Sequence, residues 1–558
     1  MSLISDSSPH RPQTCPPPRG SRSGGRNHSS TRNTMTDQHH DDVTAAPETM
    51  FDLLERRAAV TPGAGLARFA DGRALGVGEC HDLAVAAARG LARLIAPGDH
   101  VLTCLEPGPE LVSVVFALAR LGAVEVPLAL DARRPAAGTA RTLIAGADVL
   151  RRNPGLLTFA ATMDRVVLVD GEPGVLPRAI ILDDLLADRR PLPRHRPAPA
   201  DPAVVMATSG TTGRAKGALL PHFAGVRHAR RVVRSMGYTA DDVLLNVFPW
   251  NHINVRHAGL LPALISGAVL VVRPRFSASR FWQTCRTEGV SAFNFMGAMA
   301  AILERTSATP YDTGHRVRRA YGGPAPAALA RRFRERFGVE LLEAYACTEL
   351  GDVAAGSSAD HRPGAAGRPV PEYEVVIRDD DGRPVPCGRP GQITVRPRTP
   401  WTTFSEYVGD PAATRAVVRD GWFHTGDRGR FDEDGFLHFA GRRADVVRRR
   451  GENIATWEVE RVVAAMPGVL DAAAVGVPSE LTEEELLVAV AVAGGAAIEP
   501  RAVRAWCLER LPRHAVPRYV RVLGELPRNT ATKVVKGELR DQGVTADTWD
   551  ADRGRAAP

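Results

Sequence analysis

Residues 204 to 217 read Val-Val-Met-Ala-Thr-Ser-Gly-Thr-Thr-Gly-Arg-Ala-Lys-Gly, and this stretch decides the fold. Apolar residues lead into a loop of hydroxyls and glycines that ends on a lysine, which suits a bound polyphosphate because it supplies backbone N–H groups, hydroxyl donors and one mobile cation. It is not a Walker loop, since Ala215 precedes the lysine and Gly217 follows it. We predict a nucleotide-phosphate loop rather than a flexible Ser/Thr/Gly linker. Its binding residues are Thr208, Ser209, Gly210, Thr211, Thr212, Gly213 and Lys216.

Lysine is scarce in this chain. Of its 71 lysines and arginines, only three are lysines, namely Lys216, Lys533 and Lys536. In an arginine-biased sequence, a remaining lysine is a candidate for a position that needs a compact, rotatable ammonium group. We therefore expect functions for Lys216 and Lys533, and we attribute the survival of Lys536 to chance.

The bulk properties exclude several classes of protein. A chain of 558 residues suggests two to four domains, and 44% hydrophobic with 24% charged residues is an ordinary globular composition. Half of the +8 net charge comes from residues 1–34, so the remainder is too weakly basic to argue for a nucleic-acid partner. No apolar run is long enough to span a membrane, and the cysteines form no Cys-x-x-Cys pair that would indicate zinc. We expect a cytoplasmic protein.

The N-terminal segment differs from the rest. Residues 1–34 are rich in Ser, Pro, Arg and Gly, and we predict a disordered tail over residues 1–44. Met35 is an alternative start, and an Arg-rich transit peptide is a further alternative that Pro16 to Pro18 argue against.

From about Thr49 the apolar spacing becomes that of alternating helices and strands. Helices are predicted over residues 50–59, 81–94 and 109–121, and strands over 101–105, 123–128, 243–248, 268–272, 292–295 and 319–321. This alternation indicates an α/β fold, in which ligands gather at the carboxyl ends of the strands. Polar or glycine-rich segments follow three of the strands, at Phe248–Asn254, Tyr321–Ala325 and Glu343–Glu349.

Four further motifs follow in order: Gly421–Asp427, Gly441–Asp445, Gly451–Ile454 and Pro527–Lys533. Together with the loop and the strand ends, they make the chain from about residue 50 to 540 resemble the superfamily of adenylate-forming enzymes. This superfamily includes acyl-CoA synthetases, firefly luciferases and the adenylation domains of peptide synthetases.

The resemblance implies a large N-terminal domain of layered α/β subdomains and a small, mobile C-terminal α+β domain. We expect an ATP- and acid-binding domain over residues 45–441, a lid domain that carries a catalytic lysine over 442–540, and a tail over 541–558. The hinge is expected near Arg442 to Asp445. Such enzymes convert a carboxylate and ATP into an acyl adenylate and pyrophosphate, and a nucleophile, usually the thiol of coenzyme A, then takes the acyl group.

The resemblance also implies roles for single residues. The phosphate loop is expected to hold the β- and γ-phosphates, while Lys533 acts between the carboxylate and the α-phosphate. The other expected roles are Thr348 at the α-phosphate, Glu349 and Thr208 at Mg²⁺, Tyr345 with the Gly322-Gly323-Pro324 backbone at adenine, Asp427 and Arg442 at the ribose, and His252 as a further catalytic residue.

The sequence departs from the family pattern at three places. Ala444 stands at the hinge position where Asp or Lys is usual, and Thr532 replaces the glycine that normally precedes the catalytic lysine. Cys347 stands close to the expected acyl pocket, where either substrate choice or ordinary packing explains it. The segment Asn294–Met299 and the residues after His252 are expected to line this pocket, and their apolar text favours a hydrophobic or aryl acid.

Three hypotheses about function follow. The leading one is an ATP-dependent, Mg²⁺-dependent acid:CoA ligase whose partners are a small carboxylic acid, ATP and coenzyme A. The second is an adenylate-forming enzyme that passes its product to a carrier-protein thiol or an amine, or that activates nitrite in diazo-forming chemistry. The third is a non-catalytic nucleotide-binding protein, against which Lys216, Glu349, Asp427 and Lys533 argue.

Overall fold

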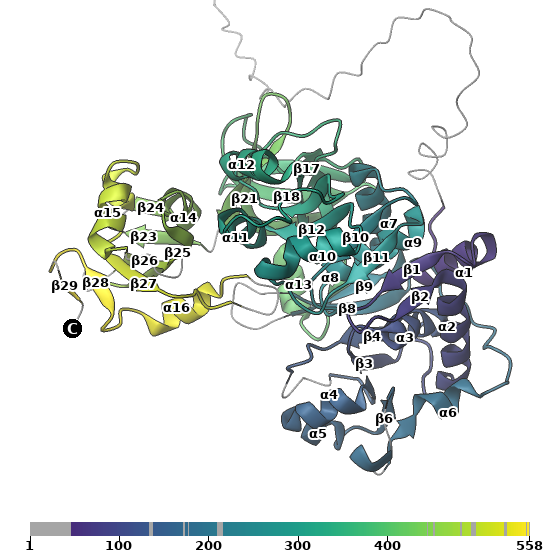
Figure 1. Cartoon of the computed structure of the whole chain (residues 1–558). Coiled ribbons are helices and arrows are strands. Elements are labelled where there is room, and N and C mark those ends of the chain that lie inside the picture. The colour runs from purple at the N-terminus through teal and green to yellow at the C-terminus, as the bar shows by residue number, and fades with distance from the viewer. Residues whose placement is uncertain are drawn as a thin grey trace, which may run out of the picture.

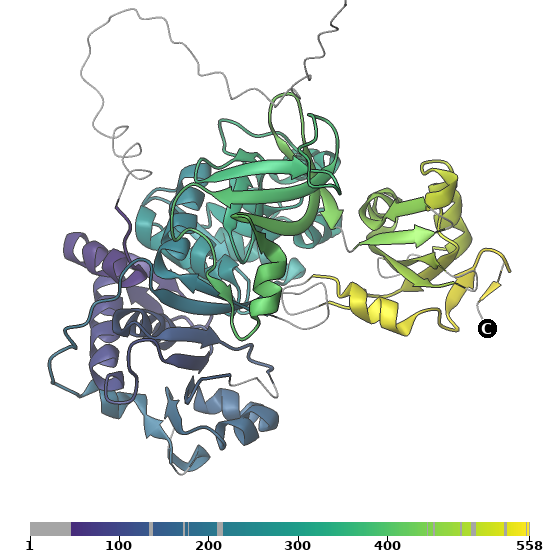
Figure 2. The same cartoon turned by 180° about the vertical axis from the view of Figure 1, so that it is seen from behind.

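The computed structural model describes residues 46–132, 138–170, 173–176, 178–208, 216–442, 445–449, 452–479, 483–492, 498–528, 533–553 and 555–556. The fold is mixed α/β, as predicted, with a large N-terminal part and a small C-terminal part that lies beside it (Figure 1, Figure 2). Within these residues, no helix is both long and apolar enough to cross a membrane.

One large sheet of the N-terminal part has nine described strands in the order β16-β15-β14-β13-β12-β10-β11-β1-β2. Its central strands run parallel to one another in the order β14-β13-β12-β10-β11-β1. Antiparallel strands lie at both edges, β2 next to β1 and β15 with β16 next to β14. The strands are β1 (Gly65–Arg68), β2 (Ala74–Gly76), β10 (Val243–Asn246), β11 (Val269–Val272), β12 (Ala292–Met296), β13 (Arg319–Gly323), β14 (Glu340–Cys347), β15 (Gly351–Ala355) and β16 (Arg368–Pro369).

A second large sheet has eight described strands in the order β19-β9-β8-β4-β3-β5-β6-β7. The antiparallel pair of β8 and β9 flanks the phosphate loop, so this loop connects two neighbouring strands rather than a strand and a helix. The strands are β3 (His100–Cys104), β4 (Val124–Pro127), β5 (Thr142–Ala145), β6 (Arg165–Leu168), β7 (Ile180–Ile181), β8 (Pro202–Thr208), β9 (Lys216–Pro221) and β19 (Glu406–Tyr407).

A layer of helices fills the space between the two large sheets and forms the largest hydrophobic core. The apolar residues from Leu111 to Leu121 belong to α3 in this layer, so their hydrophobicity reflects burial between the two sheets. The layer consists of α1 (Met50–Val60), α2 (Val77–Leu91), α3 (Pro109–Leu121), α7 (His222–Met236) and α9 (Leu261–Ser266). The outer faces are covered by α10 (Phe281–Thr287), α11 (Gly297–Arg305) and α12 (Ala327–Phe337) on the first sheet, and by α4 (Ala147–Arg152) and α5 (Pro154–Ala160) on the second. A further short helix is α6 (Leu182–Leu186).

A buried ion pair joins the helical segment after His252 to the second large sheet. Arg256, which follows the short helix α8 (Ile253–Val255), makes two hydrogen bonds to the carboxylate of Glu125 on β4, one of them 2.7 Å long. The hydroxyl of Thr103 also donates to Glu125 at 2.6 Å, and Arg256 Nε donates to the carbonyl of Trp250. Because all four groups lie in the interior, this cluster fixes the chain segment after His252 relative to the second sheet.

A third, smaller sheet packs where the two large sheets meet, and its hydrophobic core includes Tyr345 of β14 and Tyr407 of β19. Its antiparallel strands bring Asp427 directly opposite Arg442. The elements are β17 (Tyr373–Arg378), β18 (Gly391–Pro397), α13 (Pro411–Val417), β20 (Val418–Arg419), β21 (Trp422–Phe431) and β22 (Leu437–Arg442).

The small C-terminal part contains, within the described residues, a five-stranded sheet of β25 to β29, with α14 and α15 on one face and α16 on the other, and a separate two-stranded sheet of β23 and β24. The chain just before α16 extends from this part toward the large part (Figure 1). The elements are β23 (Val446–Arg449), β24 (Glu452–Ala455), α14 (Thr456–Ala464), β25 (Val469–Pro478), β26 (Glu484–Val492), α15 (Pro500–Leu508), β27 (Tyr519–Leu523), α16 (Lys536–Gln542), β28 (Thr548–Asp550) and β29 (Arg555–Ala556). Since β28 pairs with β27, the sheet extends into the segment 541–558 that we predicted as a tail.

The predicted elements agree in type with the structure and differ at their ends. The helix expected over residues 81–94 instead begins at Val77, where the Glu79 carboxylate accepts from the N–H of Gly76, and it ends at Leu91. The strand expected over residues 243–248 ends at Asn246, because the Asn246 side chain accepts from the N–H of Phe248 and turns the chain. The predicted tail of residues 1–44 lies outside the described residues.

Candidate active site

The two ends of the phosphate loop lie side by side. Thr208 is the last residue of β8 and Lys216 the first of β9, and they are direct cross-strand partners. Ser209, Gly210, Thr211, Thr212 and Gly213 lie outside the described residues. The ammonium of Lys216 lies 5.1 Å from the ring centre of Tyr407, whose hydroxyl donates to Glu349 at 2.6 Å. The loop lysine and the expected metal ligand therefore contact the same tyrosine.

Sequence reasoning missed Tyr407. It lies on the edge strand β19, where it pairs with Ala218 just after the phosphate loop. Burial and the neighbouring Glu349 carboxylate raise the pKa of its hydroxyl, so Tyr407 is a neutral hydrogen-bond donor. The sequence Ser-Glu-Tyr-Val-Gly around it carries no spacing that distinguishes it from an ordinary strand aromatic.

The glycine turn after β13 has a steric reason. A Cβ atom on Gly322 would lie 1.9 Å from the carbonyl oxygen of Phe295, its partner on β12, and the φ angle of Gly323 is +148°. Only glycine fits such an approach, which leaves a flat backbone surface at the carboxyl end of the sheet. Adenine binding against this turn stays a prediction.

Glu343 holds the end of this turn. Its two carboxylate oxygens accept from the N–H groups of Ala325 and Gly364, each at 2.9 Å. Burial raises the pKa of Glu343 to about 7, although both hydrogen bonds oppose the shift. Sequence reasoning included Glu343 only as the start of a motif and did not recognise this role.

The raised pKa of Glu343 predicts a pH-dependent stability. An unfolded glutamate has a pKa of about 4.3, so between about pH 4.5 and pH 7 the unfolded chain releases a proton that the folded chain keeps. The contribution of Glu343 to the free energy of unfolding should therefore fall as the pH rises through this range and stay level above it. Urea unfolding at pH 4.5 and pH 8 should show a decrease that is roughly 2–3 kcal/mol larger in the wild type than in Glu343→Gln. Equal pH dependence in both proteins would contradict the assignment.

The expected ribose ligands are adjacent. Tyr345 donates its hydroxyl proton to Asp427 at 2.7 Å, and Arg442 Nε lies 3.4 Å from the other carboxylate oxygen. Burial raises the pKa of Asp427, while Arg442 and the Tyr345 hydroxyl oppose this shift. Thr348 and Glu349 follow directly in the turn between β14 and β15, so one strand end supplies the expected adenine, α-phosphate and metal contacts.

Lys533 reaches this site from the C-terminal part. Arg528 forms a bridge with Val534, and the N–H of Val535 donates to the carbonyl of Pro527 at 2.8 Å, which closes the base of the loop that carries Lys533. Burial and then Arg442 lower the pKa of Lys533, whereas the carboxylates of Asp427 and Glu349 raise it. The lysine therefore lies within electrostatic reach of these residues, although Thr532 itself lies outside the described residues.

His252 also lies near Lys533. Its Nδ1 accepts from the N–H of Asn254 at 3.2 Å, and burial, with a smaller contribution from Lys533, lowers its pKa to about 4. The imidazole is therefore neutral near pH 7, with its proton on Nε2, and can act as a donor to an anion but not as a general acid at that pH.

Lys536 has a structural role that our attribution to chance missed. Its ammonium donates to Asp445 at 3.1 Å and Thr456 at 3.0 Å, and pairs with Glu460 at 2.7 Å. A compact ammonium with three protons satisfies three acceptors here, which a planar guanidinium does less well. Since Asp445 is the last residue of the expected hinge, Lys536 ties the hinge to the segment that follows Lys533. Ala444 lies outside the described residues.

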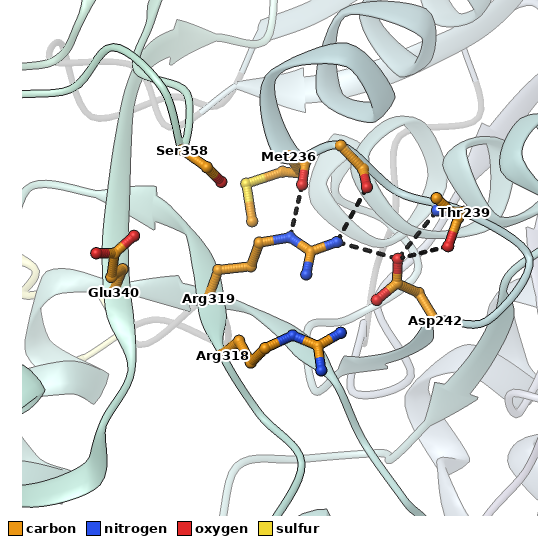
Figure 3. A pocket seen from close by; sticks show the side chains of 8 residues that line it. Met236, Thr239, Asp242, Arg318, Arg319, Glu340 and Ser358 are labelled. Atoms are coloured by element: carbon orange, nitrogen blue, oxygen red, sulfur yellow. Dashed lines mark hydrogen bonds and ion pairs between the residues drawn. The ribbon is translucent and has the colours of Figure 1, made fainter. Parts of the chain in front are cut away.

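A separate hollow of about 370 Å³ lies at the amino ends of β13 and β14, the end of these strands opposite to the candidate active site (Figure 3). Arg319 and Glu340, the first residues of β13 and β14, line it, and Arg319 donates to the carbonyl of Met236 at 2.6 Å. Because ligands of α/β sheets bind at the carboxyl ends of the strands, this hollow is not part of the candidate active site.

Comparisons with known proteins agree with this arrangement. Residues 54–408 match the family model of the AMP-binding enzyme, and residues 458–533 match that of the AMP-binding enzyme C-terminal domain. The chain is 31% identical over 473 residues to crotonobetaine/carnitine–CoA ligase of Escherichia coli O7:K1, covering 80% of this chain and 89% of the relative.

Solved structures are similar over most of the chain. ATP-bound MatB from Rhodopseudomonas palustris is 26% identical with a TM-score of 0.75, covering 88% of this chain and 98% of the other. The anthranilate CoA ligase AuaEII in complex with anthranoyl-AMP has a TM-score of 0.78 at 22% identity, covering 90% and 98%, and at this identity it supports the fold alone.

Proposed function

Since the chain belongs to the family of AMP-binding enzymes and is an AMP-forming acyl-CoA synthetase that uses ATP and coenzyme A, we propose that its substrate is a hydrophobic or aryl carboxylic acid. The observation that supports the site assignment is that Lys533, from the other part of the chain, lies within electrostatic range of Asp427 and Glu349. We take the boundary between an N-terminal domain and a C-terminal lid domain at residues 441/442.

The first half-reaction brings a carboxylate to the α-phosphate of ATP, so two anions approach each other while pyrophosphate gains charge. Positioned cations and donors therefore supply most of the acceleration. Lys533 would stand between carboxylate and α-phosphate, and Thr348 would donate to the α-phosphate. The neutral imidazole of His252 would donate from Nε2 to the carboxylate, while Lys216 and the loop hydroxyls hold the departing phosphates.

The residues present suit a magnesium ion. Glu349 is 8% exposed, and its described hydrogen-bond partner is the neutral Tyr407 hydroxyl. Within the described residues, no group of three or more His, Cys, Asp or Glu side chains forms a metal cage. Mg²⁺ is usually bound by one or two carboxylates plus substrate phosphates, so Glu349, with Thr208, would hold it. The ion would screen the transferred charge.

The same geometry supports our proposed positions for the adenosine and the acid. Asp427 and Arg442 would bind the ribose, and the adenine would lie between Tyr345 and the Gly322–Gly323 turn. The acid would lie beside His252 and the end of β12, where the half-buried side chains of Met296 and Ala298 are available to contact it. These apolar side chains support a hydrophobic or aryl substrate.

A screen for acid-dependent pyrophosphate release tests the proposed substrate class. Fatty, aryl and amino-aryl acids are incubated with ATP and Mg²⁺, with and without coenzyme A. We expect release with hydrophobic or aryl acids, and formation of the matching thioester only when coenzyme A is present. Turnover at full rate without coenzyme A would instead favour a carrier-protein thiol, an amine or nitrite chemistry.

We also propose that the protein is located in the cytoplasm, where ATP and coenzyme A are available.

A further inference from the structure

Three asparagine side chains meet beneath the segment that follows His252. Oδ1 of Asn254 accepts from Nδ2 of Asn246 at 2.9 Å and from Nδ2 of Asn294 at 2.8 Å. Asn246 ends β10 and Asn294 lies on β12, and they are 1% and 4% exposed. Two buried donors from two neighbouring strands thus converge on one amide oxygen.

Hydrogen bonds to backbone groups fix the orientation of the side-chain amides of Asn246 and Asn294. Oδ1 of Asn246 accepts from the N–H of Phe248 at 2.9 Å, and Nδ2 of Asn294 also donates to the carbonyl of Ala258 at 2.8 Å. A backbone N–H can only donate and a carbonyl can only accept, so neither amide can turn over. The oxygen of Asn254 must therefore face these two donors, and its NH₂ group points away from them.

Asn254 lies two residues after His252, in the segment that we assign to the acid. The N–H of Asn254 binds the ring of His252, and Asn294 directly precedes Phe295, which pairs with Gly322 of the glycine turn after β13. Asn254 is half-buried, and within the described part of the chain no hydrogen bond leaves its Nδ2. This locked amide therefore offers a donor that the protein itself does not use.

We infer that Asn254 Nδ2 selects acids that carry a hydrogen-bond acceptor, such as an ether, carbonyl or hydroxyl oxygen, on the tail beyond the reacting carboxylate. The inference rests on the proposed function and narrows its substrate class. A purely apolar tail would bury the amide donor without a partner, whereas an acceptor oxygen would satisfy it. The fixed orientation means that this preference cannot be relieved by rotation of the side chain.

Matched acids test this inference. Methoxy- and ethyl-substituted aryl acids have the same shape and differ by one acceptor oxygen, and ether- and methylene-containing chain acids form a second set. For wild-type protein, kcat/KM for pyrophosphate release should favour the oxygen-bearing acid of at least one pair by about tenfold or more.

Asn254→Asp is the matched variant, because its carboxylate keeps an oxygen for Asn246 and Asn294 and replaces the NH₂ donor by an acceptor. The preference should fall to about one or reverse, and Asn254→Leu should reverse it toward the apolar acid. The melting temperature of each variant shows whether it is folded.

The inference is overturned if the wild type shows no preference for the oxygen-bearing acid of any pair. It is also overturned if a folded variant keeps the wild-type ratio. Failure of the proposed function gives a different result, in which no acid of any kind releases pyrophosphate from the wild type.

Discussion

Lys533→Ala should slow acid-dependent pyrophosphate release about 10²–10³-fold, the loss typical of one transition-state donor. Transfer of the acyl group from supplied acyl adenylate to coenzyme A should continue, because the proposed role of Lys533 is confined to the first half-reaction. The ammonium of Lys533 lies within electrostatic range of Asp427 and Glu349, the expected ribose and metal ligands, which supports a role in the step at ATP. The two halves are measured separately, as pyrophosphate release and as thioester formation.

Two controls make this result specific. Lys533→Arg keeps the positive charge but replaces the compact ammonium by a planar group, so we expect only part of the activity to return. Arg318→Ala removes an exposed cation at the hollow beside the amino ends of β13 and β14, and this variant should change neither half-reaction. Equal loss of both half-reactions in Lys533→Ala would show that the assigned role is wrong.

Arg256→Met should lower the free energy of unfolding by about 3–5 kcal/mol, because it leaves the buried Glu125 carboxylate without its cation. The side chains of Arg256 and Glu125 are only 5% and 3% exposed, so water cannot replace the lost partner. Urea unfolding followed by circular dichroism measures the effect. The cost should be largely recovered in the double variant Arg256→Met/Glu125→Gln, in which no unpaired charge remains.

The exposed pair of Arg396 and Glu374 provides the comparison. Their side chains are 49% and 31% exposed, so Arg396→Met should cost about 1 kcal/mol or less. If Arg256→Met is no more destabilising than Arg396→Met, the buried pair does not hold the segment after His252 against the second sheet as we describe.

The sequence predicted the fold well because its signals are local. The phosphate loop, the strand ends and the motifs around Asp427 are short runs of neighbouring residues, and hydrophobic periodicity marks the buried strands and helices. Lys533 became a candidate only through the resemblance, since nothing in the spacing indicates that a residue of the C-terminal part reaches Asp427.

The contacts that sequence reasoning missed join residues far apart in the chain. Lys536 binds Asp445 and Thr456, which lie 91 and 80 positions away, so its use as a three-way anchor has no local signature. Tyr407 binds Glu349 from 58 positions away. Sequence reasoning also missed Asn254, because the residues around it after His252 are mostly apolar. Its polar side chain matters because Asn246 and Asn294 both donate hydrogen bonds to its Oδ1.

The most direct test of the two-step account is the product balance of a single reaction with ATP, Mg²⁺, coenzyme A and the best acid from the screen. We predict one AMP, one pyrophosphate and one acyl-CoA for each acid consumed, with acyl adenylate detectable by mass spectrometry when coenzyme A is left out. Release of ADP and phosphate, or thioester formation without AMP, would contradict it.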